Sequence, residues 1–340
     1  MTYIRPIPLH DAARPNDAVV LAGGWCRFTH LEILERGRTP VVVPASEASP
    51  SLLSPLMSPR ADFAGLTLDR PRLMGILNVT PDSFSDGGLF LKPEAAMMQA
   101  RAMAGLADIL DVGGESTRPG AVEVPVEVET ARTVPVIAAL RAAGIERPVS
   151  IDTRKAAVAQ AALAAGAGIV NDVTALQFDP GMAALVADAG VPVILMHSLG
   201  TPATMQDDPV YDDVLLDVYD ALAARVAQAE GAGISRARMA VDPGIGFGKT
   251  LAHNLALLAR LSLFHSLGVP VLLGASRKRF IGALSGEDEA ARRMPGSLAV
   301  ALAGVAQGVQ MIRVHDVQET RAAVTLWQAV TQNEDKGMTP

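Results

Sequence analysis

The sequence predicts an α/β protein whose main part, residues 71–335, is a closed (β/α)8 barrel of the TIM type. From residue 72 onward, short apolar runs alternate with longer Ala-rich stretches of helical period. Short apolar runs flanked by helices are typical of buried parallel strands. We count eight such repeats, which favours a closed barrel over an open doubly wound sheet.

The strands and helices of this barrel can be placed in chain order. We expect strands at Leu73–Asn78, Asp108–Val112, Val149–Asp152, Ile169–Asp172, Val193–His197, Met239–Asp242, Val271–Ala275 and Gln310–Val314. Helices are expected between them, for example at Pro93–Gly105, Val126–Ala143, Lys155–Ala165, Tyr211–Glu230 and Val317–Val330.

The first seventy residues have a different character. They contain eight prolines, and their only strand-like runs are Val19–Ala22 and Val41–Val43. Proline removes a hydrogen-bond donor and breaks helices. We therefore expect residues 1–70 to form a short, proline-rich and irregular extension, and the barrel to fold without residues 1–69.

Composition excludes several classes of protein. The 36 acidic residues outnumber the 29 basic ones and no basic block occurs, which argues against a nucleic-acid surface. The single cysteine, Cys26, excludes an internal disulfide and a multi-cysteine metal site. The most apolar stretch, Ser297–Ile312, is too short to span a membrane comfortably. The N-terminus also lacks the pattern of a signal peptide, so we expect a cytoplasmic protein that contacts no membrane.

The expected strands end in polar residues. In this fold the C-terminal strand ends meet at one rim, where enzymes keep their chemistry. A single Asp, Asn or Ser there is explained as well by helix capping, but such endings on all eight strands favour an active site. The residues concerned are Asn78, Asp111, Asp152, Asn171, Asp172, Met196, His197, Asp242, Ser276, Lys278, Arg313 and His315.

Three loops follow strand ends. The loop 78–88 and the loop 113–120 are polar and glycine-containing, so each is either a surface turn or a lid over a site. The segment 244–250 fits no nucleotide-binding motif, because Pro243 and Lys249 stand where those motifs require glycine. We interpret it as a flexible turn, including Gly246 and Phe247, that lets the backbone approach a flat ligand.

The charges at the rim indicate two kinds of ligand group. Cations follow strands seven and eight, where this fold commonly binds phosphate, although ordinary surface charge is the alternative. Asp152, Asn171 and Asp242 suit a flat heterocycle with N–H donors, whose carbonyl Lys278 could contact. The alternative is ion pairing across the barrel mouth. A metal site formed by these residues alone is less consistent with the sequence, because no second cluster of His or Glu accompanies them.

These segments together resemble the dihydropteroate synthase family of the folate pathway. The resemblance extends from about Leu73 to Gln328 and leaves the first seventy residues outside. Its motifs are Met74–Gly88, Asp111–Gly120, Asp242–Gly244, Ser276–Lys278 and Arg313–Asp316.

The resemblance implies a reaction, a metal and an assembly. A 7,8-dihydropterin-6-ylmethyl diphosphate would condense with 4-aminobenzoate to give 7,8-dihydropteroate and diphosphate, with the help of Mg²⁺. Sulfonamide drugs would occupy the 4-aminobenzoate pocket. A homodimer is implied as well, through the helix expected around Ser297–Gly308.

The resemblance also implies roles for individual residues. Asn78 would contact Mg²⁺, and the expected catalytic residues are Asp152, Lys278, Arg313 and His315. The pterin would be bound by Asp152, Asn171, Met196, Asp242, Gly246, Phe247, Lys278 and Arg313. The 4-aminobenzoate would be bound by Phe84, Thr117, Pro119, Lys278 and Arg279, although many family members carry Ser in place of Arg279.

Two other functions use similar residues. A pterin-dependent methyltransferase would keep the Asp and Asn set but would not need the diphosphate cations or the two lid loops. A non-catalytic pterin-binding homologue would be marked by the loss of Asn78, Lys278 or Arg313, and all three are present.

Overall fold

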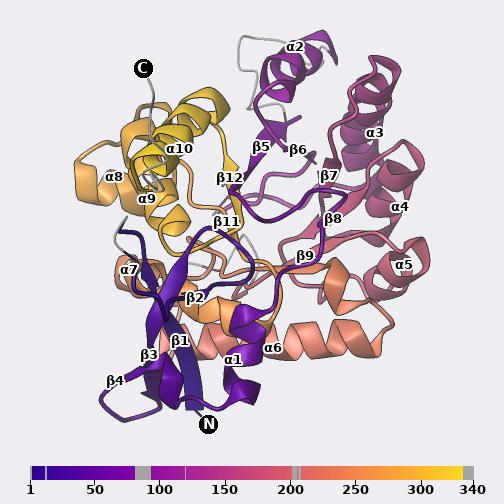
Figure 1. Ribbon diagram of the computed structural model, residues 1–340. Helices are drawn as coiled ribbons and strands as arrows, with labels where there is room; N and C mark the ends of the chain where they lie inside the picture. Colours follow the sequence, from indigo (N-terminus) through magenta and orange to yellow (C-terminus); the bar gives the residue numbers. More distant parts are fainter. Residues whose placement is uncertain are drawn as a thin grey trace.

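Eight parallel strands form the core of the chain in a computed structural model that describes residues 2–11, 14–80, 93–118, 120–200, 205 and 208–331. Their spatial order is β10-β9-β8-β7-β6-β5-β12-β11, and all of them except β10 are labelled in Figure 1. A parallel bridge between Val241 and Val271 joins the two ends of this order, so the barrel is nearly closed. The strands are β5 (Arg72–Asn78), β6 (Ile109–Gly113), β7 (Val149–Asp152), β8 (Ile169–Asp172), β9 (Val193–Met196), β10 (Met239–Asp242), β11 (Leu272–Leu273) and β12 (Met311–Val314).

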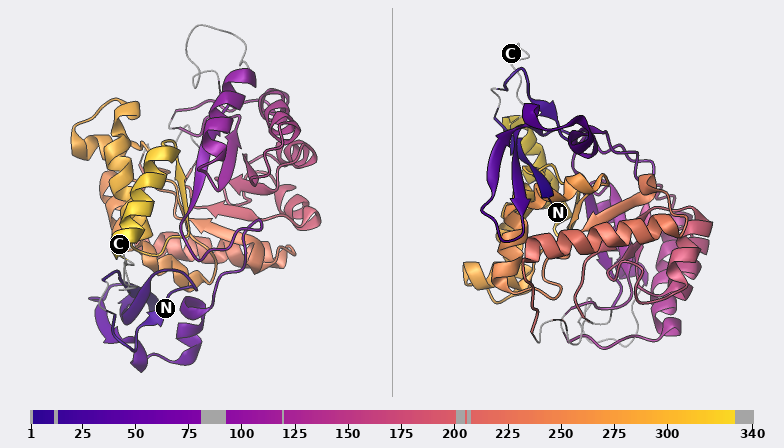
Figure 2. Two further views of the ribbon diagram at one scale, coloured as in Figure 1. Left: turned by 45° about the horizontal axis from the view of Figure 1, so that its top comes forward. Right: turned by 90° about the horizontal axis from the view of Figure 1, so that it is seen from below.

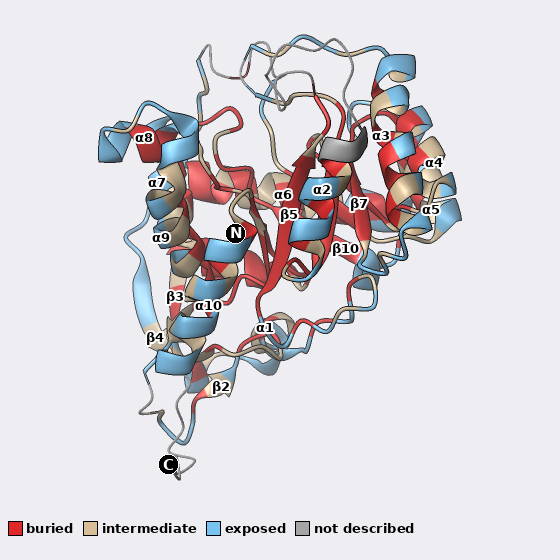
Figure 3. Cartoon of the chain, turned by 90° about the horizontal axis from the view of Figure 1, so that it is seen from above, coloured by how far each residue is buried: buried red, intermediate tan, exposed pale blue. Residues whose placement is uncertain are grey.

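Helices surround these strands, with their exposed faces outward and the buried strands at the centre (Figure 3). They are α2 (Pro93–Ala104), α3 (Val126–Ala142), α4 (Ala156–Ala164), α5 (Met182–Ala189), α6 (Val214–Gly231), η3 (Arg236–Arg238), α7 (Leu251–Ala259), η4 (Leu261–Leu267), α8 (Arg279–Ser285), η5 (Ala290–Arg293), α9 (Met294–Val305) and α10 (Val317–Thr331). No helix among the described residues is long and apolar enough to cross a membrane.

The expected barrel is confirmed, with one short strand. Three strands have the expected bounds, and the others begin and end within a few residues of them. The seventh strand is an exception, because β11 contains only Leu272 and Leu273. Val271 pairs separately with Val241 of β10, and this is where the barrel closes.

The inward side chains of the strands form two layers. Successive residues of a strand point to opposite faces, so residues two apart share the inward face. The lower inward layer is one buried apolar cluster of Met74, Ile109, Ile169, Ile194, Ala240, Leu272 and Met311. The upper inward layer lies two residues further along each chain segment and consists of Ile76, Asp111, Asn171, Met196, Asp242, Gly274 and Arg313. Asp152 belongs to this upper layer as well, two residues after Ser150. A polar layer therefore lies above an apolar one.

The expectation of an irregular N-terminal extension is wrong. Residues 2–57 contain β1 (Thr2–Leu9), β2 (Val19–Val20), β3 (Arg27–Glu35), β4 (Val41–Pro44), η1 (Ala45–Glu47) and α1 (Pro50–Met57). β3 pairs antiparallel with each of the other three strands. Four of the prolines stand where the sheet or the helix tolerates them, whereas Pro55 lies inside α1. Pro6 and Pro8 flank a register shift in β1, Pro44 ends β4, and Pro50 opens α1, all places where a missing N–H costs little.

This N-terminal module, residues 2–60, packs on the outside of the barrel. Tyr3 Oη donates to Asp220 Oδ2 on α6 at 2.8 Å, and Ser262 Oγ of η4 donates to the Pro6 carbonyl at 2.8 Å. Trp25 Nε1 donates to the carbonyl of Val305 at the end of α9 at 2.8 Å. In both views of Figure 2 the module lies beside these helices. The module is thus fastened to three elements of the barrel.

Residues 63–68 close the lower end of the barrel. Phe63 and Leu68 are buried in the same cluster as the lower inward layer, and Phe63 pairs with Leu66 in a tight turn. Two side chains from outside the expected barrel therefore complete its core. This argues against the expectation that residues 1–69 are dispensable.

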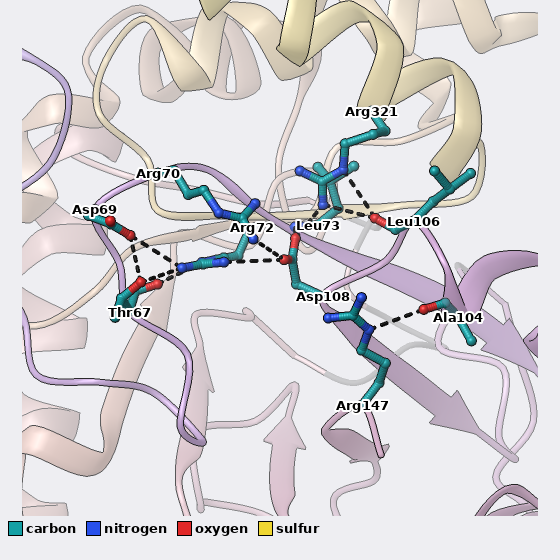
Figure 4. Close-up of polar contacts among 10 residues, drawn as sticks. All are labelled: Thr67, Asp69, Arg70, Arg72, Leu73, Ala104, Leu106, Asp108, Arg147 and Arg321. Carbon is teal, nitrogen blue, oxygen red and sulfur yellow. Dashed lines mark hydrogen bonds and ion pairs between the residues drawn. The ribbon is translucent and has the colours of Figure 1, made fainter. Parts of the chain in front are cut away.

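Asp108 ties this closing segment to the barrel (Figure 4). Its carboxylate accepts the Leu73 amide at 2.8 Å and pairs with Arg70 at 3.0 Å, Arg72 at 3.4 Å, and Arg321 of α10. Burial alone would raise the pKa of Asp108, but the Leu73 amide and the arginines lower it overall. In the unfolded chain the pKa of an Asp carboxyl is about 3.9, and above that pH the stabilisation is fully present. It is lost as the pH falls through the lower pKa that Asp108 has in the folded protein.

We expect a chain that lacks residues 1–69 to lose its cooperative thermal transition, because the apolar layer is then open at its lower end. The single substitution Phe63→Ala should lower the free energy of unfolding by about 3–5 kcal/mol, the usual cost of removing a buried phenyl ring. Thermal and urea unfolding followed by circular dichroism measure both effects. A cooperative transition in the truncated chain at the full-length midpoint would show that the barrel core is complete without this segment.

Candidate active site

The guanidinium of Arg313 lies at the centre of the polar layer. Arg313, on β12, donates through Nε to Asp111 Oδ2 of β6 at 2.6 Å and through Nη2 to Asp152 Oδ2 of β7 at 2.7 Å. The other oxygen of each carboxylate, Oδ1, is buried and has no hydrogen-bond partner among the described residues. A buried unpaired acceptor is costly, so both oxygens are suited to the N–H donors of a bound molecule.

Burial raises the pKa of Asp152 to about 7. The guanidinium of Arg313 opposes this shift, and the nearby carboxylate of Asp111 reinforces it. A carboxyl group with this pKa can take up or release a proton near neutral pH when the charge around it changes.

Asp242 and Arg313 both lie close to Gly274. Asp242 Oδ1 accepts the Gly244 amide at 2.7 Å, and burial raises the pKa of this carboxyl to about 6. Gly274 keeps a space open, because a Cβ there would lie 3.3 Å from Asp242 Oδ2 and 3.9 Å from the Arg313 side chain. Asn171 completes this side by donating to Asp111 Oδ2 at 3.3 Å. The arrangement suits a flat ring.

Lys278 and an apolar wall border the same space. Lys278 Nζ lies 4.0 Å from the centroid of the Phe247 ring, a cation–π contact. Burial and the charge of Arg313 lower the pKa of Lys278 to about 8, although Asp242 opposes the shift. Phe247 packs with Val173, Met196 and Met205 in a small buried cluster.

Side-chain hydrogen bonds hold the turn 244–250, for which the sequence predicted flexibility. Lys249 Nζ contacts the Phe247 carbonyl at 2.9 Å and His197 Nδ1 at 3.0 Å. Asn254 Oδ1 accepts the Gly246 amide at 2.7 Å. Gly244, at φ +67°, packs so closely on the end of β9 that a Cβ would lie 1.9 Å from the His197 carbonyl. Glycine is needed here for close packing, and the result is a fixed wall.

The expected phosphate side carries positive charge without full compensation. His315 Nδ1 lies 3.0 Å from Ser276 Oγ. Burial lowers the pKa of His315 to about 3, and the charges of Arg313, Arg277, Lys278 and Arg118 lower it further. Arg277 is paired with Asp316, with its Nε 3.0 Å from Oδ2, and Arg279 is exposed at the start of α8.

Most of the expected site residues meet in this mouth. Asp152, Asn171, Met196, Asp242, Gly246, Phe247, Lys278, Arg313 and His315 are brought together at the strand ends. Phe84 and Pro119 lie outside the described residues. Asp172 has a structural role, because it accepts the amides of Thr174 at 2.7 Å and Leu176 at 3.0 Å. It stabilises a turn and does not cap a helix, since α5 begins only at Met182.

No role for Asp111, Gly274 or Lys249 was expected from the sequence. Asp111 was recognised only as a strand-closing residue. Its two-residue spacing from Ile109, parallel to that of Arg313 from Met311, would have placed both side chains on the inward face. Gly274 has the same relation to Leu272. Lys249 carried no signal, because only the folded turn brings it to His197.

The comparisons with known proteins agree with this geometry. A family model described as "Pterin binding enzyme" matches residues 74–315. The dihydropteroate synthase of Escherichia coli K12 is 47% identical over 270 residues, which cover 79% of this chain and 95% of that protein.

Two solved structures are similar as well. That of Xanthomonas albilineans dihydropteroate synthase with 4-aminobenzoic acid has 53% identity and a TM-score of 0.75, and covers 80% of this chain and 98% of that one. That of the same enzyme in complex with 7,8-dihydropteroate has 50% identity and a TM-score of 0.72, with the same coverage.

We expect a bare pterin, 6-hydroxymethylpterin, to bind more weakly as the pH falls below about 7, and to release a proton from Asp152 when it binds at pH 6. A ring N–H donor favours the carboxylate form, so the affinity should fall by up to about tenfold for each pH unit below the pKa. Calorimetric titration in two buffers of different ionisation enthalpy measures the proton release. Asp152→Asn is the control that should reduce the release to the part contributed by Asp242, whose pKa is also raised, and an equal release from the wild type and the variant at pH 6 would contradict the assignment.

Proposed function

The chain belongs to the family of pterin-binding enzymes, among its dihydropteroate synthases, and from this premise we propose roles for the side chains of the barrel mouth. The enzyme is a transferase of folate synthesis. It condenses a 7,8-dihydropterin-6-ylmethyl diphosphate with 4-aminobenzoate to give 7,8-dihydropteroate and diphosphate. We also propose that this enzyme is a target of sulfonamides, because the dihydropteroate synthase of Yersinia pestis has been solved in complex with a sulfonamide drug.

The pterin ring would lie between Asp242 and Arg313, in the space that Gly274 leaves open. Asp242 would accept the protons of the 2-amino group and N3, beside Asn171 and Asp152, and Lys278 would donate to the ring carbonyl. The observation that carries this proposal is the pair of buried, unpaired oxygens on Asp111 and Asp152. Such acceptors call for a ligand rich in N–H donors, and a pterin is one.

Diphosphate release would take place on the side of Ser276 and His315. The bond between the exocyclic methylene carbon and the diphosphate oxygen breaks, and its electron pair leaves with the diphosphate. Arg313, Lys278 and the His315 N–H would stabilise the leaving group. The positive charge that develops on the pterin is favoured by the neighbouring carboxylate of Asp152. The amine nitrogen of 4-aminobenzoate then forms the new C–N bond and loses a proton, with no nucleophilic side chain required.

The residues around Asn78 fit a magnesium ion that arrives with the diphosphate. A Cβ on Gly113 would lie 3.5 Å from Asn78 Oδ1 and 3.7 Å from Asp152 Oδ2, so both oxygens border the space that this glycine leaves. The described residues contain no cluster of three His, Cys, Asp or Glu side chains that could hold a metal alone. Mg²⁺ is commonly held by one or two protein oxygens and substrate phosphates. When bound, it would neutralise charge on the diphosphate, and Asn78 would hold it.

The 4-aminobenzoate would be held by Phe84, Thr117, Pro119, Lys278 and Arg279. Of these, Lys278 is half-buried in the mouth and Thr117 stands in the loop after β6. We also propose that the enzyme is a cytoplasmic homodimer that contacts through α9. Exposed apolar side chains on the neighbouring α8 and α10, namely Leu284, Leu326 and Val330, support this interface.

We expect the pterin diphosphate to bind much more tightly with Mg²⁺ than without it, because the metal and Asn78 share the diphosphate charge with Arg313 and His315. Arg313→Ala should remove most of this difference, while bare pterin loses affinity mainly through lost contact with the ring face. Calorimetric titrations with and without Mg²⁺ on both proteins measure it.

The exposed Arg292, replaced by Ala, is the control for a general loss of positive charge. A methyltransferase would show little preference for the diphosphate and no metal dependence. Equal wild-type affinity for the bare and the diphosphorylated pterin would overturn the proposed roles.

A further inference from the structure

The loop between β6 and α3 is fastened at its base. Glu115 Oε1 accepts the Val124 amide at 2.8 Å, and Lys155 Nζ donates to the Val124 carbonyl at 2.5 Å. These contacts bring the beginning and the end of the loop together. Thr117 and residue 119 stand between them in the chain.

The same carboxylate fastens the loop to the end of β7. Arg154 Nε lies 3.3 Å from Glu115 Oε2, and Lys155 Nζ lies 3.2 Å from Glu115 Oε1. Arg154 and Lys155 follow two and three residues after Asp152. The base of the loop is therefore tied to the strand end that carries a pterin-facing carboxylate.

These side chains form a buried and charge-balanced quartet. Lys155 Nζ also pairs with Glu129 Oε2 of α3 at 2.7 Å. The side chains of Glu115, Glu129, Arg154 and Lys155 are 6%, 0%, 5% and 4% exposed. Two acids and two bases compensate one another, but removal of one partner leaves a buried charge unpaired.

Arg154 reaches a third loop as well. Its guanidinium lies 4.0 Å above the ring of Phe178, in the segment between β8 and α5. One side chain thus joins the loops that follow three adjacent strands. This is more than is needed to cap one helix or close one turn.

We propose that Glu115 and Arg154 are positioning residues for the arylamine substrate, because they fix the base of the loop that carries Thr117 relative to Asp152. The inference rests on the proposed function, which places 4-aminobenzoate at that loop. A loop fixed in its binding conformation loses less freedom when the substrate binds. Loosening its base should therefore weaken the capture of 4-aminobenzoate and leave pterin binding intact.

The first test is Glu115→Gln, assayed by steady-state kinetics. The amide oxygen can still accept the Val124 N–H, but the ionic contacts to Arg154 and Lys155 are lost. The KM for 4-aminobenzoate should rise about tenfold or more, while kcat changes less and the Kd for 6-hydroxymethylpterin stays within about twofold.

Arg154→Met is a second variant that keeps apolar contact with Phe178 and leaves Glu115 paired with Lys155. It should raise the same KM. Glu123→Gln is the matched control, because Glu123 belongs to the same loop and contacts the same arginine at 3.4 Å but is 55% exposed. Its kinetic constants should equal those of the wild type.

The outcomes separate this inference from the function on which it rests. A wild type without diphosphate release in the presence of both substrates contradicts the proposed function. An active wild type with an unchanged KM for 4-aminobenzoate in both variants overturns the inference. So does a lowered melting temperature with a parallel rise in the pterin Kd, which is the result of a merely structural role.

Discussion

One guanidinium shared by two buried carboxylates organises the barrel mouth. An isolated buried carboxylate is very unfavourable, and here Arg313 pairs with both Asp111 and Asp152. The charges of Lys278 and Lys249 oppose the rise in the pKa of Asp242. Three acidic and three basic side chains are thus grouped in the barrel mouth, where opposite charges offset part of the cost of burial.

The barrel makes this possible because its strands contribute to two layers, a lower one that stabilises the fold and an upper one that forms the active site. The lower inward layer is apolar and is sealed by Phe63 and Leu68, and the ion pairs of Asp108 hold that seal. The polar layer begins two residues later on the same strands. Substrate groups can therefore replace or rearrange contacts in the upper layer without opening the core beneath it. The N-terminal module adds contacts on the outside, at α6, η4 and α9.

Much of this architecture could be predicted from the sequence, because apolar runs and strand-closing polar residues are local signals. Asp152, Asn171 and Asp242 were placed correctly for this reason. The N-terminal sheet was missed because its prolines were counted without their positions, and Pro6, Pro44 and Pro50 stand where the sheet and helix tolerate them. Asp111 and Lys249 act through partners about 200 and 50 residues away. No local pattern reports such pairings, and Phe84 and Pro119 lie outside the described residues.

The most direct test of the shared guanidinium is the affinity of Asp111→Asn for 6-hydroxymethylpterin, measured by calorimetry beside the wild type. Asparagine has nearly the same shape, so the protein should still fold, with a lower melting temperature because a buried partner of Arg313 loses its charge. Without the charge of Asp111, Arg313 would pair with Asp152 alone and draw that carboxylate away from the ring, and Asn171 would lose its charged acceptor. Because hydrogen bonds to charged groups contribute about 1.5–3 kcal/mol, the account predicts an affinity roughly ten- to a hundredfold lower. An affinity equal to that of the wild type would contradict it.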